Sequence, residues 1–217
     1  MHKPDNLLEY DVTEQLAWDQ RLDSSRIVVK AKRGDVTLSG TVPTYYDSTI
    51  ATDDAWFVGG VKSLTNELLV GLVGEAIADA DVAAACRAAI AADKHVPKGG
   101  VGASVTDGWV TLTGEVRHHF QRQAAEHAVR GVDGVLGLTD KVEITTDPIP
   151  GDVVDRINQA FARNAIIDDS QIAVTSSGHT VFLDGTTGSH EARRAAENAA
   201  WAAPGVDDVI DRLAIVP

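Results

Sequence analysis

Histidine side chains are the first groups in this chain that could do chemistry, because imidazole binds transition metals and transfers protons near neutral pH. The 217 residues include seven histidines and one cysteine. His118 and His119 are adjacent, and His127 follows on the same predicted helix, too far along it to share an ion. No H-x-x-x-H or C-x-x-C spacing occurs, although zinc sites are built on such spacings. We expect no metal site and interpret these histidines as solvated residues at the start of a helix.

Adjacent carboxylates could serve acid–base catalysis or hold a hard cation. The pairs are Asp53–Asp54, Asp168–Asp169 and Asp207–Asp208. Neighbouring side chains on a helix or strand point in different directions, so we interpret these pairs as solvated faces. Cys86 stands where the other repeats have valine and isoleucine, which predicts a buried apolar role. No nucleophile elbow or phosphate loop occurs, so the sequence predicts neither catalysis nor a cofactor.

Composition and charge limit the partners. Hydrophobic residues make up 44% of the chain, which is typical of globular proteins, and the net charge is −13. An acidic surface repels nucleic acid and disfavours electrostatic capture by anionic lipid. No apolar run is long enough to span a membrane, and the N-terminus lacks the apolar segment of a secretory signal. We therefore expect a cytoplasmic protein that does not bind nucleic acid.

A short strand pattern that ends in glycine occurs three times, and a Gly-Val pair follows each closing glycine twenty residues later. The closing glycines are Gly40, Gly114 and Gly185, and the pairs begin at Gly60, Gly134 and Gly205. Apolar positions on both sides keep the same register, with offsets of 74 and then 71 residues. We predict three copies of one module. The modules are 7–70, 81–144 and 152–215, and the linkers are 71–80 and 145–151.

Each module shows the same order of patterns. A helix with apolar residues spaced by four comes first, followed by two short strands around a tight turn. An alanine-rich helix and a final alternating strand complete the unit. The predicted fold class is α+β, with three tandem αββαβ modules, each a three-stranded mixed sheet carrying two helices on one face. About 64 residues is near the lower limit for independent stability, so we expect the modules to pack together.

Tryptophan is the most informative of the remaining residue types. Trp56 and Trp201 occupy the same position of the alanine-rich helix, where the second module has Arg130. This position lies on the flank of the helix, so its side chain covers the edge of the core, contacts a neighbouring module, or forms a patch for a partner. Trp18, on the polar side of the first helix, belongs to the same candidate interaction surface. Trp109 opens a hairpin strand and is expected on the open face of its sheet.

The glycine-ended strand, the alanine-rich helix, the Gly-Val pair and the alternating last strand together resemble the BON domain. The resemblance covers nearly the whole chain and implies no catalytic residues. It implies a stress-related role in which the protein contacts phospholipid headgroups or a protein partner. Two alternatives stay open: a sensor of a monovalent cation such as potassium, and a structural adaptor or chaperone-like protein that could be oligomeric. The six motif glycines are interpreted as structural, allowing a positive φ or a close backbone approach.

Overall fold

The computed structural model describes residues 3–71, 77–146, 149–168 and 171–216. The first module contains α1 (Asp5–Trp18), a short 3-10 turn (Ser24–Arg26), β1 (Ile27–Lys32), β2 (Asp35–Val42), α2 (Tyr45–Phe57) and β3 (Ser63–Val70). The second contains α3 (Asp79–Ala92), β4 (Val101–Thr106), β5 (Trp109–Val116), α4 (His119–Arg130) and β6 (Gly137–Ile144). The third contains α5 (Val153–Ala162), β7 (Ile172–Ser177), β8 (Thr180–Thr187), α6 (His190–Trp201) and β9 (Asp208–Ile215).

The three sheets share one topology. In the first, β1 pairs antiparallel with β2, and β2 pairs parallel with β3. The sheets β4-β5-β6 and β7-β8-β9 repeat this order and these directions. The predicted αββαβ module with a mixed three-stranded sheet is therefore confirmed in all three copies.

The hairpin in each module depends on residues that tolerate a left-handed backbone. Arg33 and Gly34 both have positive φ, as do Asp107 and Gly108, which suits the two-residue turns that match strand twist. Further along β5, Gly114 has a φ of +134°, and a Cβ built on it would lie 2.1 Å from the Gly100 carbonyl oxygen. Gly40 and Gly185 show the same approach. Glycine is thus required where the first edge strand begins.

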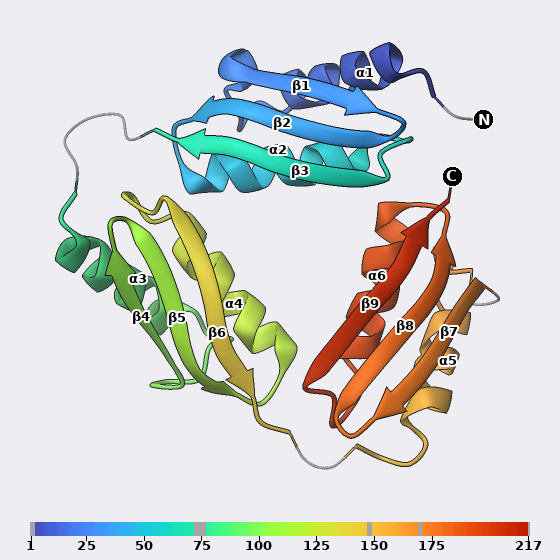
Figure 1. The fold of residues 1–217 in the computed structure, drawn as a ribbon. Coiled ribbons are helices and arrows are strands. Elements are labelled where there is room, and N and C mark those ends of the chain that lie inside the picture. The colour runs from blue at the N-terminus through green and yellow to red at the C-terminus, as the bar shows by residue number, and fades with distance from the viewer. Residues whose placement is uncertain (1–2, 72–76, 147–148, 169–170, 217) are drawn as a thin grey trace.

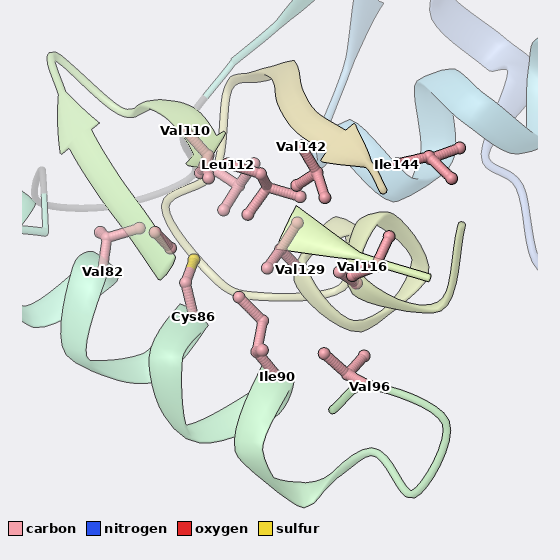
Figure 2. Close-up of a cluster of buried hydrophobic side chains, with 13 residues drawn as sticks. Val82, Cys86, Ile90, Val96, Val110, Leu112, Val116, Val129, Val142 and Ile144 are labelled. Atoms are coloured by element: carbon pink, nitrogen blue, oxygen red, sulfur yellow. The ribbon is translucent and has the colours of Figure 1, made fainter. Parts of the chain in front are cut away.

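Each module has its own apolar core between its sheet and its two helices. Leu38, Leu112 and Leu183 hold equivalent positions on the central strands and are fully buried. Figure 2 shows the second core, where Cys86 on α3 points toward the sheet among valine, leucine and isoleucine side chains. The predicted apolar role of Cys86 is confirmed, and burial raises the pKa of its thiol.

The modules are arranged as a triangle (Figure 1). The alanine-rich helices α2, α4 and α6 lie on the inner side, and α1, α3 and α5 lie on the outer side. In this view each sheet lies in front of its two helices. The last module returns to the first, because α6 contacts α2. The chain therefore closes into a ring of three modules.

Candidate functional site

The inner helices of neighbouring modules meet at three contacts, which we call seams. Two of the seams contain a stacked pair of rings. Trp56 near the end of α2 stacks on His190, the first residue of α6, with ring centroids 4.0 Å apart and planes at 10°. Trp201 at the end of α6 stacks on His119, the first residue of α4, at 4.0 Å and 9°. The end of one inner helix thus meets the beginning of another.

The third seam uses the same two positions with different residues. Arg130 ends α4 where the other modules have tryptophan, and Tyr45 begins α2 where they have histidine. Tyr45 packs against the core of the second module. Its burial there raises the pKa of the phenol, and the Arg130 charge opposes that rise. The three seams are equivalent by position, so the ring has approximate threefold symmetry.

Polar groups of the inner helices reinforce the seams. Arg194 of α6 lies 3.9 Å from the Asp53 carboxylate of α2. Partial burial lowers the pKa of His127 on α4, and the charges of Arg130, Asp53 and Arg194 act on it as well. The guanidinium of Arg122 lies 5.9 Å from the ring centroid of Trp201. Side chains from all three modules therefore share one electrostatic environment.

The two stacked histidines are neutral at pH 7. Burial is the main cause that lowers the pKa of His119 to about 4, and the Arg122 charge lowers it further. Burial, with Arg194 and Arg193, likewise lowers the pKa of His190 to about 4. The interpretation as solvated residues is right for His118, which is exposed, and wrong for His119, because packing between modules buries its ring.

The four residues of the candidate interaction surface separate into two environments. Trp56, Arg130 and Trp201 are partly buried at the seams, whereas Trp18 on the outer helix α1 is 83% exposed. Trp109 is 51% exposed on the open face of its sheet, where its Nε1 donates to Thr139 Oγ1 at 2.8 Å.

A polar tie between each inner helix and its last strand escaped sequence reasoning. In the second module Arg122 Nε donates to Asp140 Oδ2 at 2.7 Å, and Asp140 Oδ1 accepts from the Val142 amide at 2.8 Å. The third module repeats this with Arg193 and Asp211, and the first has Ser48 and Asn66. The signal was present in the alignment of the copies, where these six residues fill two matching positions.

Asp54 departs from the expectation that the acidic pairs are solvated. Its side chain is 5% exposed, and its Oδ2 has no hydrogen-bond partner among the described residues. Burial raises the pKa of this carboxyl to about 6, the Asp19 charge raises it further, and Arg21 opposes the shift. Asp53 is exposed as expected, and Asp169 lies outside the described residues.

Metal ligation and membrane insertion are two further functions that side chains and helices of the described part of the chain could serve. Within it, no group of three or more histidine, cysteine, aspartate or glutamate side chains could hold a metal ion. None of its helices is both long enough and apolar enough to cross a bilayer.

A cleft lies at each seam, between the first turn of one inner helix and the chain that follows the end of its neighbour. The cleft between modules 1 and 2 has a volume of about 260 Å³, and that between modules 1 and 3 about 340 Å³. The cleft between modules 2 and 3 is the largest of the three, at about 890 Å³. Clefts at domain interfaces of this size are common ligand sites.

Comparison with known proteins agrees with the repeated fold. The sequence profile described as "BON domain" matches residues 4–71, 78–146 and 151–217. The chain belongs to the BON-domain family. Each match contains one complete αββαβ module of the structure, so this is a triple BON-domain protein.

Two relatives match this BON-domain protein over about the length of two modules. Osmotically-inducible protein Y of Escherichia coli strain K12 is 32% identical over 144 residues, which cover 64% of this chain and 72% of the relative. The 21 kDa hemolysin of Actinobacillus pleuropneumoniae is 32% identical over 145 residues, covering 64% and 75%. Among solved structures, CdsD of the Chlamydia trachomatis type III secretion system aligns over 98% of this chain and 93% of its own. The TM-score of this alignment is 0.28 and the sequence identity is 14%.

Proposed function

We propose that this BON-domain protein is a non-enzymatic, stress-related binding protein that presents three sheet faces to a phospholipid surface or a protein partner. The observation that carries the proposal is the closed ring. Its seams occupy the inner helices, while the sheet faces opposite the helices stay uncovered in all three modules. The name of the relative described as osmotically inducible supports the stress-related role.

The open faces combine apolar and charged side chains, and Arg212 lies 3.6 Å from the Asp184 carboxylate. Val28 and Trp109 are each 51% exposed, and Leu69 is 68% exposed. On the third sheet, the Arg212 guanidinium lies 5.2 Å from the Phe182 ring centroid. Such mixed surfaces suit the boundary between headgroups and acyl chains, where aromatic rings and basic groups are both favoured. Three weak contacts on one rigid body would add avidity without any strong single site.

Flotation with lipid vesicles tests the phospholipid half of the proposal. The full chain would be mixed with phosphatidylcholine or phosphatidylglycerol vesicles at low and at physiological salt. We expect co-flotation that weakens in the double variant Leu69→Ser/Trp109→Ala, because both side chains lie on open sheet faces. Trp18→Ala is the matched control, since it removes an exposed indole from an outer helix.

The protein-partner half requires a separate experiment. Chemical cross-linking in stressed and unstressed cells, followed by mass spectrometry, would locate contacts on the chain, and cell fractionation would test the expected cytoplasmic location. Cross-links should fall on the open sheet faces. Absence of both vesicle binding and sheet-face cross-links would contradict the proposal.

A further inference from the structure

The cleft between modules 2 and 3 differs in charge from its two equivalents. It is formed by the first turn of α4, the chain after α6, and the residues Thr145, Thr146 and Pro150 that precede the third module. None of the described residues that line it is aspartate or glutamate, although the whole chain has a net charge of −13. Its polar side chains include Arg117, His118, Gln123, Thr145, Thr146 and Asn198.

The other two clefts provide an internal comparison. Where this cleft has Arg117 and His118, the cleft between modules 1 and 2 has Pro43 and Thr44. The cleft between modules 1 and 3 has Gly188 and Ser189. Both of those clefts also contain carboxylates. They are Asp47 and Asp133 between modules 1 and 2, and Asp53 and Glu191 between modules 1 and 3. Among the described lining residues, the module 2–3 cleft is therefore the one of these three that combines Arg117 and His118 with no carboxylate.

Local structure fixes the basic groups at the mouth of this cleft. The imidazole of His118 stacks on the Phe120 ring, with centroids 5.5 Å apart and planes at 12°. The backbone amides of Arg117 and His118 donate to Gln121 Oε1 at 3.0 and 3.1 Å. The side chain of Arg117 is exposed and forms no ion pair among the described residues, so its guanidinium is available.

Both sides of the cleft provide groups that favour an anionic ligand. The first turn of α4 contains no acidic residue, so the partial positive charge at this end of the helix is not cancelled there. On the opposite side, Thr146 Oγ1 donates to the Gly205 carbonyl at 3.1 Å, which holds the incoming segment against the third module. The amide groups of Gln123 and Asn198 offer further donors.

We propose that the cleft between modules 2 and 3 binds a phosphate group, carried by a lipid headgroup or free in solution. Arginine is suited to phosphate because its planar guanidinium donates two parallel hydrogen bonds. His118, Gln123 and Asn198 provide donors around it. The inference goes beyond the sheet-face contact, because it requires an intact seam and does not involve the open faces.

Titration of the full chain with inorganic phosphate tests this proposal. NMR signals of the Arg117 Nε and the His118 ring would be followed at pH 7, with sodium chloride at equal ionic strength as the reference. We expect saturable shifts with phosphate. The double variant Arg117→Gly/His118→Ser, which carries the residues of the third module at these positions, should bind at least about tenfold more weakly, as expected for loss of about 1.4 kcal/mol.

Two controls make the result decisive. Lys30→Thr removes one positive charge from the first sheet and should leave the titration unchanged. Arg117→Gln alone, at an exposed position outside the helix, should weaken phosphate binding without lowering the melting temperature. Absence of saturable shifts in the unaltered chain, or equal shifts in the double variant, would overturn the proposal.

Vesicle flotation separates the two sources of phosphate. If phosphatidylglycerol flotation falls in the double variant together with phosphate binding, the cleft holds a lipid headgroup. If phosphate binding falls and flotation does not, the cleft holds free phosphate, and the sheet-face proposal stands by itself. If flotation depends on Leu69 and Trp109 while the titration shows no saturation, the cleft proposal fails and the sheet-face proposal survives.

Discussion

At the level of single residues, Asp54 is a buried carboxyl that we expect to destabilise the first module. It lies on the inward face of α2, three residues after Ala51 and one before Ala55, both fully buried. The equivalent residues in the other modules are Ala128 and Ala199. Its Oδ2 has no hydrogen-bond partner among the described residues, and a buried carboxyl oxygen left without a donor is costly once the group is ionised.

Replacing Asp54 with alanine should therefore stabilise the first module at neutral pH. The pKa of Asp54 is about 6 in the folded chain and ordinarily near 3.8, so the folded state holds the extra proton between these values. Its stability should fall as pH rises from about 4 to 6. We expect Asp54→Ala to gain about 1 to 3 kcal/mol at pH 7, measured by urea unfolding.

The same variant should show little gain below about pH 3, where the carboxyl is mainly protonated in both the folded and the unfolded state. Asp53→Ala is the control, because Asp53 is exposed on the next position of the helix. A loss of stability for Asp54→Ala at pH 7 would show that the carboxyl has a favourable partner.

Sequence reasoning at this scale succeeded where the copies agreed in residue type. Cys86 was correctly predicted as buried because its equivalents are apolar in the other modules. Asp54 was misjudged because the pairing of acids was given more weight than helical spacing. Its spacing from Ala51 and Ala55 places it on the buried stripe, so the signal was available.

At the level of elements, the polar tie between each inner helix and its last strand sets their relative position. The Asp140 side chain is 8% exposed, and its two oxygens join Arg122 of α4 to the backbone of β6. Removing the carboxylate would leave the guanidinium partly buried without its charge partner. The tie therefore holds α4 in place while its first residue contacts the neighbouring module.

Substitution of Asp140 by alanine should destabilise the second module by about 2 to 3 kcal/mol. The double variant Arg122→Ser/Asp140→Asn copies the neutral pair of the first module, where Asn66 Nδ2 donates to Ser48 Oγ at 2.9 Å. We expect it to recover at least half of that loss, as judged by chemical unfolding. If the double variant were less stable than Asp140→Ala, the two ties would not be interchangeable.

The order and type of the elements could be predicted from sequence because three copies repeat one pattern of apolar residues and turn glycines. The ends of the inner helices were harder to interpret. The flank position of Trp56, Arg130 and Trp201 left three readings open, and the structure places all three residues at contacts between modules or beside them. A single module offers no pattern that identifies its neighbour.

At the level of the whole molecule, packing between modules was expected from their small size, but closure of the ring was not. Closure depends on the rotation that each seam imposes between successive modules, which hydrophobic periodicity does not encode. The seams also bury the imidazoles of His119 and His190, and this burial links the shape of the molecule to pH.

Acid should loosen the ring before it unfolds the modules. The pKa of each stacked histidine is about 4 in the closed ring and ordinarily about 6.5. An open form therefore binds more protons between these values, and closure weakens as pH falls through that window, whereas above it closure is unaffected. We expect the radius of gyration from small-angle X-ray scattering to increase between pH 6.5 and 4.5, with far-ultraviolet circular dichroism unchanged.

The control variant is His119→Tyr/His190→Tyr, which places the Tyr45 residue type of the third seam at the other two. It retains an aromatic ring at each contact and removes the titrating group, so its radius of gyration should be constant over the same range. Equal expansion of this variant would assign the change to the acidic surface of the protein rather than to the seams.

The contacts between modules are directional, because the end of one inner helix always meets the beginning of another. Each inner helix carries tryptophan or arginine near its end and histidine or tyrosine at its first position. Three modules in a ring bring all of these side chains into contacts. A version cut before the third module would leave the Trp56 indole and the His119 imidazole unmatched. An indole and an imidazole are also the groups that stack in the intact protein, so we expect shortened chains to associate with one another. The number of chains in such an assembly would depend on how many unmatched contacts each chain has, rather than on how strongly each contact binds.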